Sequence, residues 1–150
     1  MKMTSFVLIV VTAAFLAPGA RADLAAAKAE SNLEKRAAKA LDNAQAALKT
    51  AEQSYDEDAD LPKTEAALKE VAESVQFAYD SLLATGKNPS KSPKHFKRAE
   101  IKTREMMRRL DDFRAKLGSE ERGVVEATRD SVQRVHDSLL EGIMGGGKKK

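Results

Sequence analysis

The sequence predicts an all-α protein, an antiparallel up-down bundle of four long helices. Four segments carry apolar residues at steps of three and four, which is the spacing of one helix face. Three clusters of turn residues separate these segments, and no segment alternates apolar and polar residues as a half-buried strand does. The predicted helices are about 31–57, 61–85, 93–117 and 120–143.

The first predicted helix has the thinnest apolar face. Its large apolar residues recur only about once in two turns, and alanines fill the stripe between them: Ala37, Ala40, Ala44, Ala47 and Ala51. Alanine has the highest helix propensity and lets a neighbouring backbone approach closely. It buries little area, so we expect this helix to be the least firmly docked. A second copy of the chain that covers the stripe would form a homo-oligomer.

The second predicted helix follows an acidic turn at residues 56–60. Asp60 is the expected N-cap, with Pro62 in the first turn and Gly86 just past the end. The core stripe of this helix is Leu68, Val71, Val75, Ala78 and Leu82. The acidic turn lacks the central glycine and terminal glutamate of a calcium-binding loop. It is therefore interpreted as a solvated turn.

The third and fourth predicted helices carry the most regular stripes. Ser92 is the expected N-cap of the third, followed by Pro93, and Gly118 ends it. The stripe of the third helix is Phe96, Ala99, Thr103, Met106, Leu110, Phe113 and Leu117, and that of the fourth is Val125, Thr128, Val132, Val135 and Leu139. Phe77, Ile101 and Met107 lie off the main stripes, where they widen the core or form an exposed patch.

The connections suggest how the helices are arranged. Matched helix lengths and short turns favour antiparallel neighbours in an up-down bundle. The longer loop at residues 86–93 also allows two separate helical hairpins. The second pair of helices does not repeat the first, which argues against a helical-repeat architecture.

The amino terminus predicts a secretory signal peptide at residues 1–22. Lys2 precedes an apolar run at residues 6–17, and Ala20 and Ala22 form an A-x-A cleavage site. The chain is therefore expected to be exported, either to a periplasm or as a secreted protein. Residues 23–144 form the predicted single helical domain, and residues 145–150 a flexible tail of three glycines and three lysines. No later segment is long and apolar enough to cross a membrane.

Charge is distributed unevenly along the chain. Residues 23–86 hold 7 basic and 13 acidic side chains, whereas residues 87–150 hold 17 basic and 10 acidic ones. The third predicted helix carries seven basic residues off its apolar stripe: Lys94, Lys97, Arg98, Lys102, Arg104, Arg108 and Arg109. A positive face attracts anions, so these residues are the predicted binding site for an anionic envelope surface or an acidic protein. Alternatively, they complement the acidic first hairpin within the fold.

The two histidines offer a second candidate site. In an antiparallel hairpin that turns at Gly118, His95 and His136 fall towards the same end of the third and fourth helices, and Glu100 can join them. A transition metal needs three or four convergent ligands. These residues define the alternative function of a small metal- or ligand-binding carrier.

Several function classes are disfavoured. The chain has no cysteine, and neither histidine has the serine or aspartate context of an activated nucleophile. It also lacks glycine-rich strand-to-helix turns, so we predict a non-enzymatic protein without a cofactor. Export and the few aromatic residues in the basic run argue against nucleic acid. A holdase-like chaperone is a further alternative.

Overall fold

The computed structural model describes residues 24–145, and it confirms the all-α bundle. The helices are α1 Leu24–Lys28, α2 Leu33–Asp58, α3 Leu61–Ala84, α4 Lys94–Lys116 and α5 Arg122–Ile143. The four long helices begin and end within two residues of the predicted positions, and no strand occurs within the described range. The predicted signal peptide, and the predicted tail beyond Gly145, lie outside the described residues.

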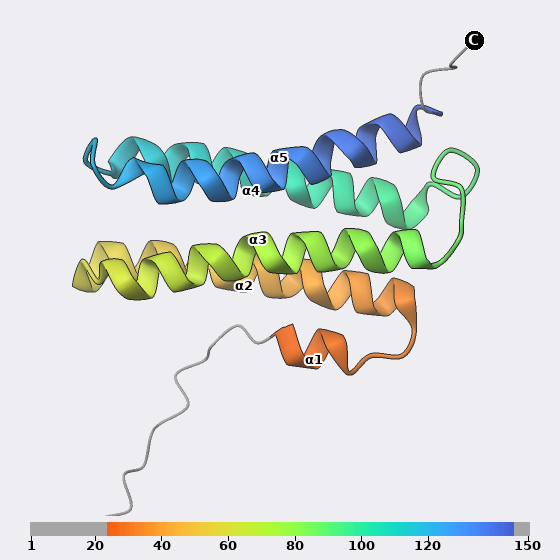
Figure 1. The fold of residues 1–150 in the computed structure, drawn as a ribbon, viewed down its shortest axis with the longest axis horizontal. Helices are drawn as coiled ribbons and strands as arrows, with labels where there is room; N and C mark the ends of the chain where they lie inside the picture. The colour runs from red at the N-terminus through yellow and green to blue at the C-terminus, as the bar shows by residue number, and fades with distance from the viewer. Residues whose placement is uncertain (1–23, 146–150) are drawn as a thin grey trace, which may run out of the picture.

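The bundle consists of two helical hairpins stacked on one another (Figure 1). The α2–α3 hairpin forms one layer and the α4–α5 hairpin forms the other, so that α3 lies beside α5 and α2 lies beside α4. The consecutive helices α3 and α4 are diagonal to each other, and the loop at residues 85–93 connects the layers. Each helix therefore has a parallel neighbour in the other hairpin.

The predicted stripes form one core. All of the stripe residues named for α3, α4 and α5 are buried. Phe77 and Met107 pack partly buried against this core, whereas Ile101 is 44% exposed. The first two therefore widen the core, and the third belongs to the surface.

The alanine stripe of α2 is covered within the chain. Its alanines are at most 2% exposed, and α3 presents small residues in return, among them Ala67, Ser74 and Ala78. Asn43 of α2 donates hydrogen bonds to Glu70 and Ser74 across the contact, at 3.0 and 2.9 Å. Since α2 and α3 share the most extensive helix contact in the described chain, α2 is firmly docked through close approach. The stripe leaves no surface for a second copy.

The helix ends follow the predicted chemistry at some positions and depart from it at others. Asp60 caps α3 by accepting a hydrogen bond from the backbone N–H of Lys63, and Gly86 has the left-handed φ of +68° that a C′ glycine adopts. The cap at Ser92 is wrong, because Pro93 takes that position without a side-chain hydrogen bond. The Ser92 N–H is instead bonded to the carbonyl of Asn88, within a turn.

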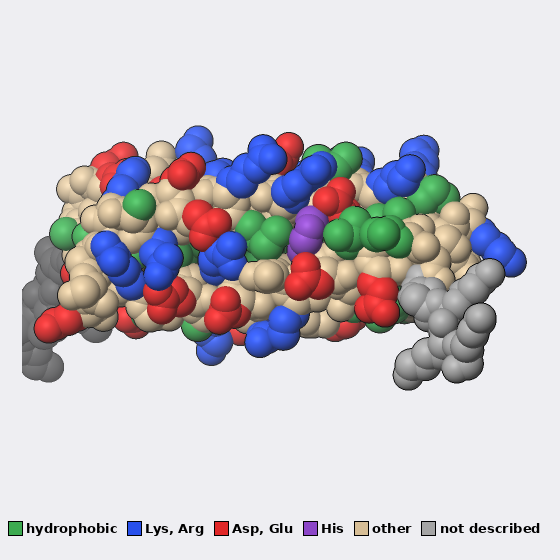
Figure 2. Space-filling model, turned by 90° about the horizontal axis from the view of Figure 1, so that it is seen from above, with side chains coloured by type: hydrophobic (Ala, Val, Ile, Leu, Met, Phe, Trp, Pro, Cys, Tyr) green, Lys and Arg blue, Asp and Glu red, His purple; other side chains and the backbone are tan. Residues whose placement is uncertain are grey.

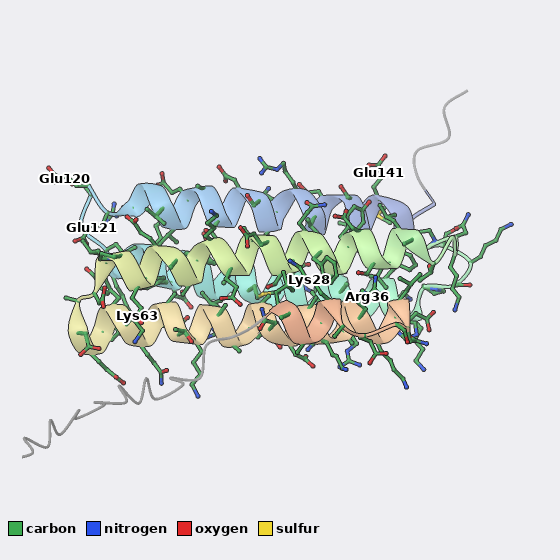
Figure 3. The ribbon with its side chains drawn as sticks, turned by 60° about the horizontal axis from the view of Figure 1, so that its bottom comes forward. Lys28, Arg36, Lys63, Glu120, Glu121 and Glu141 are labelled. Carbon is green, nitrogen blue, oxygen red and sulfur yellow. The ribbon has the colours of Figure 1, made fainter. Side chains whose placement is uncertain are left out.

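The short helix α1 was not predicted. It lies along α2 (Figure 3), and Ala27 is 1% exposed. Asn32 caps α2, and the carboxylate of Glu30 accepts a hydrogen bond from Lys39 at 2.8 Å. The backbone carbonyl of Glu30 accepts another from Arg36 at 2.6 Å. These bonds fix the turn between α1 and α2.

Candidate anion-binding face

Eight of the ten Lys, Arg and His residues of α4 fall into two rows. Seven residues make almost two helical turns, so residues seven apart lie on the same side of a helix. His95, Lys102, Arg109 and Lys116 have this spacing, and we call them the inner basic row. The helix has six other cations, all exposed to solvent. Arg104 and Arg114 form ion pairs with Glu100 and Glu126. The remaining four form the outer basic row: Lys94, Lys97, Arg98 and Arg108.

The inner basic row pairs with acidic residues of α2. His95 Nε2 lies 3.2 Å from a carboxylate oxygen of Glu34, and Lys116 lies 3.2 Å from Asp56. Two further pairs lie between them: Lys102 with Asp42, and Arg109 with Glu52. Arg109 makes two hydrogen bonds to its carboxylate, at 2.7 and 3.3 Å, and Lys102 also reaches Gln45 at 3.1 Å.

These pairs explain part of the charge asymmetry. For Lys102 and Arg109, two of the seven predicted binding residues, the acidic first hairpin complements the basic helix within the fold. Their acidic partners on α2 were not predicted from the sequence. The seven-residue spacing of the inner basic row marks one side of α4, but its acidic partners on α2 do not share this spacing, so the spacing alone does not identify them.

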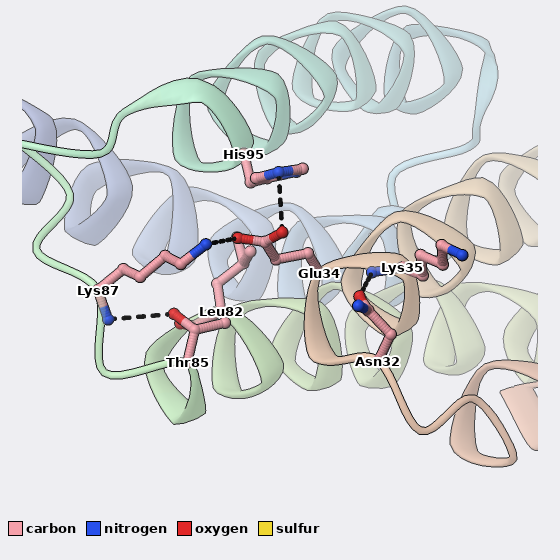
Figure 4. Close-up of polar contacts among 7 residues, drawn as sticks. All are labelled: Asn32, Glu34, Lys35, Leu82, Thr85, Lys87 and His95. Atoms are coloured by element: carbon pink, nitrogen blue, oxygen red, sulfur yellow. Dashed lines mark hydrogen bonds and ion pairs between the residues drawn. The ribbon is translucent and has the colours of Figure 1, made fainter.

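Glu34 is the most highly contacted acid of this interface (Figure 4). Lys87, from the loop after α3, forms an ion pair with it, and His95 approaches its other oxygen. The hydrogen bond from Lys87 lowers the pKa of the Glu34 carboxyl, and the charges of His95, Lys87 and Lys94 add to this effect against the opposing effect of desolvation. Thr85 accepts a bond from the Lys87 N–H at 3.2 Å, which holds the start of the loop.

The outer basic row has a different environment. Its four side chains are exposed, and none of them forms a hydrogen bond or ion pair with any residue of 24–145. Arg104 lies nearby but pairs with Glu100 of the same helix at 3.5 Å. Ile101 is exposed among these cations. Of the seven predicted binding residues, the outer basic row therefore supplies the four that are open to a partner.

The three candidate metal ligands do not converge. Glu100 and His136 are brought together as expected, with His136 Nδ1 3.8 Å from Glu100 Oε1. His95 lies with Glu34 on the α2 side instead. The hydroxyl of Thr103 donates to the carbonyl of Ala99 at 2.9 Å and lies 3.1 Å from His136 Nδ1. Within the described part of the chain, no group of three or more His, Cys, Asp or Glu side chains is placed to hold a metal ion.

A polar contact between the end of α2 and the start of α5 was likewise not predicted from the sequence. The Tyr55 hydroxyl donates a 3.0 Å hydrogen bond to the carboxylate of Glu121, just before α5, and the Tyr55 ring packs edge-on against Phe113 at 5.7 Å. The hydrogen bond to Glu121 raises the pKa of Tyr55, and desolvation and the charge of Asp56 act in the same direction. This contact ties α2 to the second hairpin.

Removing the Glu121 charge is expected to lower the pKa of Tyr55. In a Tyr79→Phe background Tyr55 is the single tyrosine, so absorbance at 295 nm reports its ionisation alone. Glu121→Gln should shift this titration to lower pH, and Glu120→Gln, at the neighbouring exposed position, should shift it less. Because the folded pKa is raised, the hydrogen bond stabilises the fold below about pH 10 and is lost as the pH rises through the folded pKa. Equal shifts in the two variants would contradict the pairing.

A surface hollow of about 650 Å³ lies between α2 and α3. It is lined by Ala47, Thr50, Asp60, Pro62, Lys63, Ala66, Ala67 and Glu70. The lining combines small alanine side chains with the titratable residues Asp60, Lys63 and Glu70, and it contains no histidine. None of the helices in residues 24–145 is long and apolar enough for a membrane crossing.

The chain matches no known protein family, no curated protein and no solved structure.

Proposed function

We propose that this chain is an exported, non-catalytic helical protein that binds an acidic protein or an anionic envelope surface through α4. The observation that carries the proposal is the outer basic row, whose four exposed side chains form no hydrogen bond or ion pair with residues 24–145, while the inner basic row pairs with acidic residues of α2. The pattern of charge, apolar run and A-x-A site in residues 1–22 supports export.

The outer basic row suits an extended anionic partner. Lys94 and Arg108 are 14 residues apart, which is about 21 Å along a helix. Lys94, Lys97 and Arg98 lie within one Debye length of each other along the helix, about 8–10 Å at physiological salt, so they act on a nearby anion together. Arg108 extends the row towards the other end of α4. Each cation near an anionic surface contributes about 1 kcal/mol.

Replacing the outer basic row by glutamine should abolish retention on an anionic polymer. Immobilised polyaspartate is a suitable probe, with elution by a salt gradient. At about 1 kcal/mol for each cation, the variant Lys94→Gln, Lys97→Gln, Arg98→Gln, Arg108→Gln should bind at least about a hundredfold more weakly at low salt. Retention of the wild-type protein should decrease when the loading buffer contains more salt, because salt screens exposed charges.

A matched control separates position from net charge. Lys28, Lys35, Lys49 and Lys63 are exposed on α1, α2 and α3, and their side chains form no hydrogen bond or ion pair with residues 24–145. Replacing these four lysines by glutamine changes the net charge equally. If both variants lose retention to the same extent, binding depends on overall charge, and the proposed site is wrong.

A further inference from the structure

The second hairpin also carries acidic residues without a partner. Asp130, Asp137 and Glu141 of α5 are exposed, and none of them forms a hydrogen bond or ion pair with another described residue. We call them the outer acidic row. Glu141 points outward from α5, away from the bundle (Figure 3).

The two outer rows lie at matching heights along the hairpin. Four contacts fix the register of α4 against α5, among them Asp111 with Arg129 at 2.5 Å and Thr103 with His136 at 3.1 Å. The same register places Arg108 of α4 level with Asp130, and Lys97 level with Glu141, each within one helical turn. The rows nevertheless form no ion pair with each other within residues 24–145.

Exposed apolar side chains accompany the charged rows. Ile101 of α4 is 44% exposed, Leu140 of α5 is 40% exposed, and Met144 just after α5 is 77% exposed. On the α4–α5 face (Figure 2), hydrophobic side chains gather beside a histidine, many Lys and Arg side chains lie along the α4 edge, and acidic side chains mixed with further basic ones lie across the face from them. An apolar centre with charged edges is typical of a protein–protein interface.

We propose that the α4–α5 face docks onto the same face of a second copy of this chain. The inference depends on the proposed function, because it identifies the acidic partner of the outer basic row as the outer acidic row of the second copy. A two-fold axis parallel to the helices places α4 of each copy against α5 of the other. Lys97 then faces Glu141, Arg108 faces Asp130, and Ile101 and Leu140 are covered.

The charges select this arrangement over the other symmetric one. A two-fold axis perpendicular to the helices would place α4 against α4 and bring the two outer basic rows together, which is unfavourable. The face is about 33 Å long and about 20 Å wide, given helices of 22 or 23 residues and a helix diameter of about 10 Å. Two copies would therefore bury roughly 1,300 Å², near the lower end of specific interfaces, so we expect a reversible dimer.

Charge reversal tests the arrangement directly. The first variant, Lys97→Glu with Arg108→Glu, makes the facing positions of α4 acidic, and the second, Asp130→Lys with Glu141→Lys, makes those of α5 basic. Each variant alone places like charges opposite each other, so sedimentation velocity at low salt should show at least a tenfold weaker dimer than wild type. An equimolar mixture should recover dimerisation, because both edges of the mixed dimer join opposite charges. At one edge the acidic α4 of the first variant faces the basic α5 of the second, and at the other edge the wild-type pairing is kept.

The control variant reverses two charges elsewhere. Lys49→Glu with Lys63→Glu alters the exposed surface of α2 and α3 and should leave the dimer unchanged. Circular dichroism of all variants verifies that the helices are retained. Dimerisation that persists in both charge-reversed variants, or a mixture that stays monomeric, would overturn the inference.

The outcomes also separate this inference from the proposed function. A wild-type protein that stays monomeric at about 100 μM and low salt but binds polyaspartate would overturn the dimer and leave the proposed function intact. A monomer that binds vesicles containing phosphatidylglycerol would do the same. Absence of both polyaspartate binding and self-association would reject both proposals.

Discussion

Phe113→Ala is expected to lower the free energy of unfolding by about 3–5 kcal/mol. Phe113 is 1% exposed, and its ring packs edge-on against Tyr55 of the other hairpin. The substitution removes a large buried ring and leaves a cavity where the last turn of α4 meets the carboxyl-terminal part of α2. The loss combines the transfer free energy of the ring with the cost of that cavity.

Urea denaturation followed by the helical circular dichroism signal measures this effect. Leu83→Ala is the matched control, because Leu83 is 49% exposed and near the end of α3. The control should change stability by no more than about 0.5 kcal/mol. A loss below about 1 kcal/mol for Phe113→Ala would contradict the packing described for this ring.

Ala44→Leu is expected to destabilise the protein by about 1–3 kcal/mol, although leucine is the more hydrophobic residue. Ala44 is 0% exposed in the middle of α2, in the helix pair that packs most closely. Leucine has nearly the helix propensity of alanine, so the loss would arise from the added volume. The larger side chain would have to push neighbouring helices apart or adopt a strained rotamer.

Ala46→Leu provides the comparison within the same helix. Ala46 is exposed two residues away, so the same substitution there adds volume only towards solvent. Thermal unfolding of the two variants should show a lower midpoint for Ala44→Leu and little change for Ala46→Leu. An increase in stability for Ala44→Leu would mean that α2 and α3 leave an unfilled space.

The helices and the core were predictable because their signals are local. The stripe from Phe96 to Leu117 follows from the geometry of a single helix, and all seven of its residues are buried. Asp60 and Gly86 mark helix ends through side-chain and backbone preferences that do not depend on the rest of the fold. At Ser92 the local rule failed, because Asn88 organises the preceding turn by accepting hydrogen bonds from Ser90 and Lys91.

Contacts between helices were harder to predict. The alanine stripe was expected to be weakly docked because small side chains bury little area, but close approach to the small residues of α3 compensates for this. The separation of Lys102 and Arg109 from the outer basic row depends on which helix lies beside α4. That neighbour is α2, which a loop and a whole helix separate from α4 in the sequence. A single sequence does not specify this neighbour.

The helix α1 was missed for a related reason. Five residues are too few to show a periodic pattern, and a helix this short is not stable by itself. Ala27 is buried where α1 packs against the bundle, a tertiary contact that the local sequence does not indicate.

The inner basic row makes the two long edges of the molecule respond differently to ionic strength. Where α2 meets α4, solvent-accessible ion pairs flank the apolar contact of Tyr55 with Phe113, and dissolved salt weakens these ion pairs. Where α3 meets α5, the buried Thr128 hydroxyl bonds the carbonyl of Leu68 among apolar side chains that salt screens little. Concentrated electrolyte should therefore loosen one edge before the other, and amide hydrogen exchange would rise first along α2 and α4.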